Sequence, residues 1–334
     1  MAGERIAVDF GNAQTKIYKL GAGLVLSEPT VAVVSDRENT KARVIGTEAK
    51  KLIGKTASDT KIIFPVFEGE IVSDKVASKT LSEFLKKTKS TSILGVKAVM
   101  SVPCGANANF LKKLESVATD AGITHVDFVE APILSALGQG LTLTDVSPYF
   151  IIDMGAGNTN IAAVSLEGVI SGISVNIGGN NIDTAIIDYL ADAYGLQVGI
   201  ITAEKLKIQV GSLVENDTLA TVVNGRDVLT GKPRSISVKA SDIKCVLEKY
   251  YDKIVSLSLK VLAKLPPEVS AEIRHAGIYV SGGSASVYGL EEYFTKKFSM
   301  QVTVAENPSS SVVFGGGVIG ANQKLLDKLK VVYN

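Results

Sequence analysis

A short motif that occurs twice constrains this chain more than any other feature of its sequence. Residues 8–17 read Val-Asp-Phe-Gly-Asn-Ala-Gln-Thr-Lys-Ile, and residues 152–161 read Ile-Asp-Met-Gly-Ala-Gly-Asn-Thr-Asn-Ile. An aspartate, a glycine, a threonine and an isoleucine recur at the same separation of 144 positions. Apolar residues flank each copy, so each predicts a β-hairpin whose turn carries the aspartate and the glycines. The chain is therefore predicted to contain two similar halves.

The residue types in these turns suit a phosphate group. Glycine lets backbone N–H groups approach an oxyanion closely, and threonine adds a hydroxyl donor. An aspartate at a strand end can hold a hydrated Mg²⁺ that bridges phosphate oxygens. One such copy alone indicates only an ordinary glycine turn. Two copies in register favour a clamp that holds a triphosphate from both sides.

Composition narrows the function classes. The chain has 334 residues, enough for one large or two medium domains, and mixed strand and helix signals predict an α/β protein. A net charge of +1 argues against a nucleic-acid partner. Cys104 and Cys245 are too few for a disulfide framework and are interpreted as buried thiols in a reducing cytoplasm. Neither a signal-peptide pattern nor an apolar run of the ~18–20 residues that a span needs is evident, so a cytoplasmic protein is expected.

Two further glycine pairs follow predicted strands. Gly178-Gly179 precedes a helix, whose N-terminus is then placed to approach a ribose or a phosphate. Gly282-Gly283 precedes a helical segment and is suited to lie flat against an adenine ring. We expect both pairs to border the same nucleotide.

Two other features each leave two interpretations open. Glu204 and Lys207 lie one helical turn apart, which suits contacts with a nucleoside but equally suits an ordinary surface ion pair. The run 315–317 consists of three glycines and is predicted to precede the last helix, either as a flexible junction or as a point of close backbone packing.

The sequence resembles the actin/Hsp70/sugar-kinase superfamily and, within it, the MreB branch of bacterial actin homologues. The resemblance covers nearly the whole chain. The stretches most specific to the MreB branch are Leu-Ser-Glu-Pro-Thr-Val at 26–31 and Arg-Asp-Val-Leu-Thr-Gly at 226–231. Other matching stretches include Asp-Met-Gly-Ala-Gly-Asn-Thr at 153–159 and Thr-Ala-Glu-Lys-Leu-Lys-Ile at 202–208. It implies an actin-like fold in which two RNase H-like domains close on a nucleotide.

The resemblance also implies domain boundaries. It predicts domain IA at 1–32 and 66–148, subdomain IB at 33–65, domain IIA at 149–180 and 245–314, subdomain IIB at 181–244, and a C-terminal helix at 315–334 that returns to domain IA.

Site residues carry over from the resemblance position by position. The cofactors implied are ATP or GTP with Mg²⁺, and Asp9 and Asp153 match the aspartates that hold the metal through water. The implied nucleotide contacts are Gly11, Asn12, Ala13 and Gln14 in the first turn, Gly155, Ala156, Gly157 and Asn158 in the second, Gly179 and Asn180 near the ribose, Glu204 and Lys207 at the nucleoside, and Gly282, Gly283 and Ser284 at the adenine.

The chain departs from the family pattern where the family hydrolyses nucleotide. MreB proteins carry two glutamates before the proline that is Pro132 here, and the second orients the attacking water; this chain has Ala131 there and keeps only Glu130. The expected threonine at 158 is an asparagine. Loss of a group that activates water costs ~10²–10⁴ in rate, so slow or altered hydrolysis is predicted. In the alternative, Glu130 swings in as the catalytic residue and the ATPase runs at an ordinary rate.

The family implies that the partner is a second copy of the chain, in head-to-tail protofilaments that are expected to pair. A loop at 90–96 offers Ile93 and Leu94 for peripheral contact with a membrane, or else anchors into the core. Three other functions stay open: a MamK-like filament that positions an organelle, a small-molecule kinase and a chaperone-like module. Short subdomain segments disfavour the kinase, and the absence of a substrate domain disfavours the chaperone.

Overall fold

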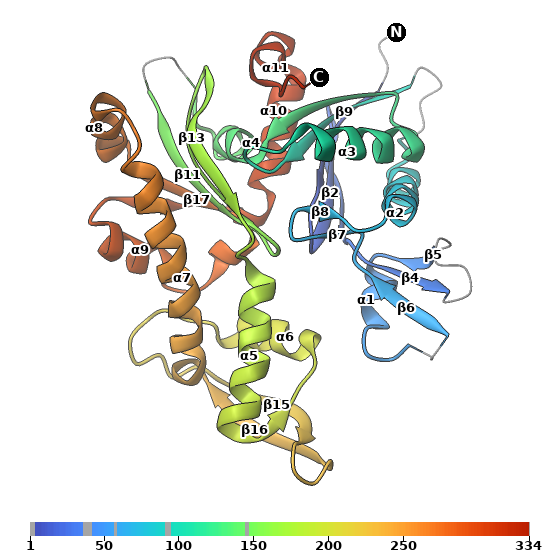
Figure 1. Cartoon of the computed structure of the whole chain (residues 1–334), viewed down its shortest axis with the longest axis vertical. Coiled ribbons are helices and arrows are strands. Elements are labelled where there is room, and N and C mark those ends of the chain that lie inside the picture. The colour runs from blue at the N-terminus through green and yellow to red at the C-terminus, as the bar shows by residue number, and fades with distance from the viewer. Residues whose placement is uncertain (1–3, 36–41, 57–58, 91–94, 144–146, 334) are drawn as a thin grey trace.

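Two five-stranded sheets form the centre of the molecule. A computed structural model describes residues 4–35, 42–56, 59–90, 95–143 and 147–333 (Figure 1). The first sheet has the order β10-β9-β1-β2-β3 and the second has the order β18-β17-β11-β12-β13. Their strands are β1 (Glu4–Phe10), β2 (Gln14–Lys19), β3 (Gly23–Pro29), β9 (Val96–Val102), β10 (His125–Glu130), β11 (Tyr149–Met154), β12 (Thr159–Ser165), β13 (Gly168–Val175), β17 (Ile278–Ser281) and β18 (Val302–Val304).

The two sheets repeat each other strand by strand. In each, the hairpin strands pair antiparallel, as β1 with β2 and β11 with β12, and the first of them also pairs in parallel with a later strand, β9 or β17. In each sheet a further strand, β3 or β13, pairs antiparallel with the second strand of the hairpin. The remaining strand, β10 or β18, pairs in parallel with β9 or β17. The predicted α/β class and the two similar halves are confirmed, with the duplicated motif at the same place in each sheet.

Helices cover the sheets and connect them. The first half contributes α1 to α4, the second α5 to α9, and α10 and α11 close the chain. Their bounds are α1 (Thr47–Lys51), α2 (Asp74–Lys87), α3 (Ala108–Ala121), α4 (Ala131–Gly138), α5 (Gly179–Tyr194), α6 (Ile200–Val210), α7 (Ala240–Leu262), α8 (Pro267–Ala276), α9 (Leu290–Phe298), α10 (Ser311–Ala321) and α11 (Gln323–Leu329), with 3₁₀ turns η2 (Gly283–Ser286) and η3 (Pro308–Ser310). We name the described residues 4–143 the first lobe and residues 147–310 the second lobe.

Each lobe carries a smaller sheet, which in Figure 1 lies at the bottom for the second lobe and at the right, near mid-height, for the first. In the first lobe this sheet is β5-β4-β6 and in the second it is β14-β15-β16, while β7 and β8 form a short ribbon in the first lobe. The strands are β4 (Ala32–Ser35), β5 (Ala42–Ile45), β6 (Thr60–Ile63), β7 (Val66–Phe67), β8 (Glu70–Ile71), β14 (Leu196–Gln197), β15 (Ala220–Asp227) and β16 (Pro233–Lys239). Apart from Ala32 at the start of β4, these sheets lie within the segments predicted as IB and IIB, whose boundaries stay a prediction.

The apolar core is built around strands whose two faces are both covered. Every residue of β12 is buried, as expected for a strand with helices on each side, so its side chains are mostly apolar rather than alternating. One apolar cluster fills each lobe. A third cluster joins them through α4 and α10, packing Val99 and Val129 of the first sheet and Ile151 and Ala162 of the second. The two halves therefore share a core at the crossing of these helices.

The C-terminal segment differs from the prediction. The stretch 315–334 is not one helix, because α10 begins at Ser311 and α11 spans Gln323–Leu329. The three glycines lie inside α10. A Cβ on Gly315 would come within 1.8 Å of the carbonyl oxygen of Leu134 on α4, so these glycines are a close packing point and not a junction. Tertiary packing has overridden the low helix propensity of glycine.

The two cysteines differ in exposure. Cys104 is buried as predicted, but Cys245 is exposed on α7, so its interpretation as a buried thiol was wrong. No helix in the described ranges is long and apolar enough to cross a membrane. The loop residues Ile93 and Leu94 lie outside the described residues.

Candidate functional site

The two copies of the motif form two turns with the same geometry. Gly11 N–H donates to the carbonyl of Gln14 at 3.1 Å, and Gly155 N–H donates to the carbonyl of Asn158 at 2.9 Å. A Cβ on Gly11 or on Gly155 would lie 2.9 Å from that same oxygen, so the tightness of each turn requires glycine. The equivalence seen in sequence thus extends to hydrogen bonding.

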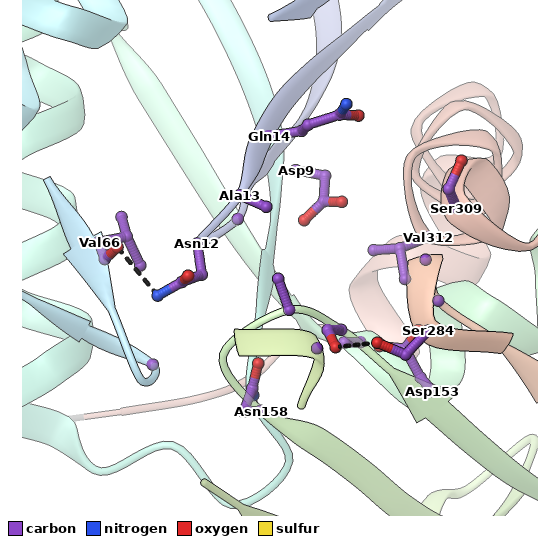
Figure 2. Close-up of a pocket in the computed structure, with 18 of the residues that line it drawn as sticks. Asp9, Asn12, Ala13, Gln14, Val66, Asp153, Asn158, Ser284, Ser309 and Val312 are labelled. Atoms are coloured by element: carbon purple, nitrogen blue, oxygen red, sulfur yellow. Dashed lines mark hydrogen bonds between the residues drawn. The ribbon is translucent and has the colours of Figure 1, made fainter. Parts of the chain in front are cut away.

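The turns meet each other through Asn12. Its side chain is 8% exposed and would lie 2.8 Å from a Cβ on Gly157, so the second turn approaches the first closely. Asn12 Oδ1 accepts from Asn180 Nδ2 at 2.7 Å, and its Nδ2 donates to the carbonyl of Val66 at 3.1 Å (Figure 2). Asn12 therefore ties the two lobes together beside the turns.

The motif threonines have a different role from the predicted one. Thr15 and Thr159 are fully buried. The Thr15 hydroxyl hydrogen-bonds the hydroxyl of Thr30 at 2.8 Å, and Thr159 donates to the carbonyl of Ile177 at 2.6 Å. Both fasten the hairpins to neighbouring segments, so neither hydroxyl is left to bind a phosphate.

The two aspartates stand on opposite sides of the cavity, each held by neighbours from adjacent strands. Ser101 donates to Asp9 at 2.8 Å. On the other side Ser281 donates to Asp153 at 2.9 Å and Asn160 donates to its second oxygen at 3.2 Å. Burial raises the pKa of Asp9, and burial together with the charge of Asp9 raises the pKa of Asp153 to about 6. Both carboxylates therefore lack enough compensating positive charge.

This arrangement fits a hydrated divalent cation. Uncompensated carboxylate oxygens are the ligands that Mg²⁺ prefers, and Mg²⁺ usually keeps several waters while it bridges phosphates. Within the described residues no group of three or more His, Cys, Asp or Glu side chains forms a closed cage. Asp9 and Asp153 would hold the ion through water, and the ion would supply charge to the phosphates.

Sequence reasoning missed Lys16, which lies between the two aspartates. It is 6% exposed on β2, opposite Asp9 in the strand register, and its ammonium donates to the carbonyl of Ser309 in η3. Burial lowers the pKa of Lys16, against the charges of Asp9 and Asp153, which raise it. The available signal was its position in the duplicated motif, since Lys16 corresponds to Asn160.

The other lysines of the site are fixed by carboxylates. Lys207 Nζ lies 2.8 Å from Asp183 Oδ1 and donates to the carbonyl of Gly179 at 3.0 Å, so it secures the start of α5. Lys50 Nζ lies 2.7 Å from Glu204 Oε2, and this pair joins α1 to α6. Glu204 and Lys207 therefore pair with different side chains and not with each other.

Ser284 and Gly282 shape the opposite wall. Ser284 donates to the carbonyl of Gly155 at 2.8 Å (Figure 2), and Tyr251 donates to the carbonyl of Ser284 at 2.7 Å. Gly282 has φ 85°, and a Cβ there would meet the carbonyl oxygen of Met154 at 2.1 Å. The loop is therefore packed directly against the strand that carries Asp153.

These residues enclose a cavity of about 340 Å³, which is in the range of small-molecule sites. All but two of the residues predicted for the site line this cavity. They are Asp9, Gly11, Asn12, Ala13, Gln14, Asp153, Gly155, Ala156, Asn158, Gly179, Asn180, Glu204, Lys207, Gly282, Gly283 and Ser284. The two that do not line it are Gly157, which packs against Asn12, and Glu130.

Glu130 is occupied elsewhere. Its Oε1 accepts the N–H of Gly105 at 2.6 Å, whereas Ala131 lines the cavity. Of the described residues that line the cavity, the acidic ones are Asp9, Asp153, Asp183 and Glu204. Each of these already accepts a hydrogen bond or an ion pair. The described lining thus holds no acidic side chain without a hydrogen-bond or ion-pair partner.

Comparison with known proteins identifies the family. The family model described as MreB/Mbl protein matches residues 3–328. The chain belongs to the MreB/Mbl family. This MreB/Mbl protein is 33% identical to cell shape-determining protein MreB of Escherichia coli K12 over 318 residues, covering 93% of the chain and 92% of that protein. It is 32% identical to cell shape-determining protein Mbl of Bacillus subtilis 168, with 98% of each chain covered.

Solved structures confirm the actin-like fold that the resemblance implied. MreB5 of Spiroplasma citri bound to AMPPNP superimposes on the MreB/Mbl protein with a TM-score of 0.92 and 27% identity, covering 97% of this chain and 98% of that one. The same protein has also been solved with ADP. MamK in a double helical filament gives a TM-score of 0.81 at 22% identity, covering 95% and 99% of the two chains, and shares the fold.

Proposed function

We propose that this MreB/Mbl protein is a cytoskeletal filament protein that binds ATP with Mg²⁺ between its lobes and hydrolyses it slowly. The observation that carries the proposal is the matched pair of glycine turns, with Asp9 and Asp153 on opposite sides of one cavity. Backbone N–H groups in tight turns bind phosphate oxygens, and the two carboxylates fit a hydrated cation. Structures of MreB5 with AMPPNP and with ADP support a nucleotide as the ligand.

Slow hydrolysis is proposed because of the residues in and beside the cavity. Ala131 offers a methyl group where a water-orienting carboxylate is expected, and Glu130 is bonded to Gly105. Asn158, in place of the expected threonine, donates to Ser174 at 3.1 Å. A nucleotide would therefore persist in its triphosphate form for longer than in a protein with a general base.

Self-association is proposed as the output of nucleotide binding. The curated relatives are cell shape-determining proteins, and this chain covers more than nine-tenths of their length. We propose head-to-tail protofilaments that pair, in the cytoplasm, with peripheral membrane contact through Ile93 and Leu94 as a separate prediction. We expect assembly to require the nucleotide.

Nucleotide binding is tested by calorimetric titration of ATP and GTP in the presence of Mg²⁺. We expect one site per chain. Asp153→Asn should weaken affinity by about 10- to 100-fold, because a charged contact to the cation is lost. Asp192→Asn, which makes the same change at an exposed position of α5, should bind as the wild type does. An absence of binding at millimolar nucleotide would contradict the proposed function.

Filament formation is tested by sedimentation with ATP, with ADP and without nucleotide, followed by negative-stain imaging. We expect pelleted filaments with ATP. Failure to sediment under all three conditions would remove the filament assignment, whatever the result of the titration.

A further inference from the structure

A single polar residue interrupts a buried and otherwise apolar helix. Every residue of α4 from Ala131 to Leu137 is buried, and Ser135 is the only one of them with a polar side chain. A buried hydroxyl costs free energy unless it is hydrogen-bonded, so a serine at this place requires a partner. Ser135 has its partner across the lobe boundary. Its Oγ lies 2.6 Å from the Oγ of Ser281 on β17, and both serines are fully buried.

This contact is one link in a chain of hydrogen bonds with a fixed direction. Ser281 donates its only proton to Asp153 at 2.9 Å, because an ionised carboxylate can only accept. The hydroxyl of Ser135 therefore donates to Ser281. Gln139, at the C-terminal end of α4, in turn donates to the Oγ of Ser135 at 3.1 Å. The chain thus runs from the end of α4 to the carboxylate of Asp153.

The duplicated sheets show which part of this chain is additional. Ser101 on β9 donates to Asp9 at 2.8 Å, just as Ser281 on β17 donates to Asp153. Ser101 lines the cavity, whereas the described lining includes neither Ser281 nor Ser135. The carboxylate of Asp153 is therefore held by residues that a ligand in the cavity does not contact, and this support begins on a helix of the other lobe.

We propose that Ser135 and Ser281 are positioning residues, which hold Asp153 in the orientation that receives a hydrated divalent cation. The inference rests on the proposed binding of ATP with Mg²⁺ and deepens it, because the cation site then depends on contact between the lobes at α4. Side chains that orient a metal-site ligand typically contribute about 10- to 100-fold to metal affinity. Hydrogen bonds in a chain also polarise one another, so Ser135 strengthens the bond that Ser281 makes.

The test measures ATP affinity in saturating Mg²⁺ and in EDTA. In Mg²⁺, Ser281→Ala should weaken binding by about tenfold, the lower end for a direct partner of a metal-site carboxylate. Ser135→Ala should weaken it by about threefold, because Ser281 stays in place but loses its donor. In EDTA both variants should bind ATP as the wild type does, since no cation is there to be received.

A double variant shows whether Ser135 acts through Ser281. Ser135→Ala combined with Ser281→Ala should lose no more affinity than Ser281→Ala alone, because the chain is already broken. Independent effects would multiply to about thirtyfold, would show that Ser135 acts through packing, and would overturn the proposal. This comparison uses only the affinities in Mg²⁺, so it decides even where ATP does not bind in EDTA.

Ser258→Ala is the matched control. Ser258 is a fully buried serine on α7 whose hydroxyl has no hydrogen-bond partner within the described residues, and it lies outside the described lining of the cavity. Its removal should leave ATP affinity unchanged in both buffers. Thermal unfolding without nucleotide shows whether each variant is folded.

The remaining outcomes are distinguishable. Equal losses for Ser135→Ala in Mg²⁺ and in EDTA overturn the proposal, because a merely structural tie between the lobes would not depend on the metal. Wild-type affinity for Ser135→Ala in Mg²⁺ also overturns it. No binding by the wild type in either buffer contradicts the proposed function instead, before any variant is compared.

Discussion

Lys50 on α1 and Glu204 on α6, which both line the cavity, form an ion pair with 2.7 Å between Nζ and Oε2. The two helices belong to opposite lobes, and Asn12 and Asn180 make a second bridge nearby at 2.7 Å. Three of these four bridging side chains, those of Glu204, Asn12 and Asn180, are ones that the family resemblance assigns to the nucleotide. A ligand that recruits Glu204 would have to draw it from Lys50.

Loss of this ion pair should speed the exchange of nucleotide. Lys50→Ala is expected to raise the dissociation rate of a fluorescent ADP about two- to fivefold, the effect of one partly exposed pair. Stopped-flow displacement measures the rate. Lys51→Ala is the control, since Lys51 pairs with Glu48 on its own helix at 2.7 Å. Equal rates for both variants would show that the pair does not hold the lobes closed.

Ala131→Glu should accelerate hydrolysis. A carboxylate at this lining position can orient and polarise water, and a positioned base contributes ~10²–10⁴ in rate, so a gain of at least about tenfold is expected. Single-turnover phosphate release measures it, with Ala131→Gln as a control of the same size that is not a base. Wild-type and Ala131→Glu rates that agree would show that the missing glutamate does not limit hydrolysis.

Glu130→Gln tests the alternative source of a base. Because Glu130 accepts the N–H of Gly105 at 2.6 Å, its removal should leave phosphate release within about twofold of the wild type. A loss of 100-fold or more in the same assay would make Glu130 the catalytic residue and contradict the assignment of slow hydrolysis to Ala131.

Glu28 should make stability depend on acidic pH. Burial works to raise its pKa, but hydrogen bonds from Lys87 and Thr47 outweigh burial and hold the pKa of Glu28 below its ordinary value. The contribution is present above the pKa of an unfolded glutamate and is lost as pH falls through the lower folded value. Glu28→Gln should therefore cost about 1 kcal/mol at pH 7 and progressively less below about pH 5.

Urea unfolding between pH 3 and pH 7 measures this dependence. Glu272→Gln, at an exposed position of α8, should leave the pH profile unchanged. A constant difference between Glu28→Gln and the wild type at every pH would show that the hydrogen bonds to the ionised carboxylate are not its source.

Two glycines of α10 should respond oppositely to alanine. Gly315→Ala places a Cβ 1.8 Å from a backbone oxygen of α4 and should destabilise the fold by at least about 3 kcal/mol. Gly320→Ala meets the side chains of Leu20 at 3.4 Å and Val99 at 3.7 Å and gains helix propensity, so it should be neutral or stabilising by up to about 1 kcal/mol. Denaturant unfolding compares them, and equal losses would refute the close packing.

The sequence was sufficient to predict features that depend on local repetition. Asp9 and Asp153 share strand ends and flanking glycines, so their equivalence and their place in the sheets could be read directly. The partners of Lys16, Lys50 and Lys207 could not, because Ser309, Glu204 and Asp183 are brought near only by packing between distant segments. Thr15 and Thr159 were misassigned for a related reason: a motif specifies a hydroxyl but not the neighbour that engages it.

The crossing of α4 and α10 determines how the two lobes can move. At Gly138 and Gly315 each backbone lies directly against the other helix, with no side chain between them that could repack. Such a contact resists sliding but permits small rotations about the crossing point. The cavity is therefore expected to open and close by rotation of the two lobes about this crossing. A small rotation there would move the sheets β5-β4-β6 and β14-β15-β16 the farthest.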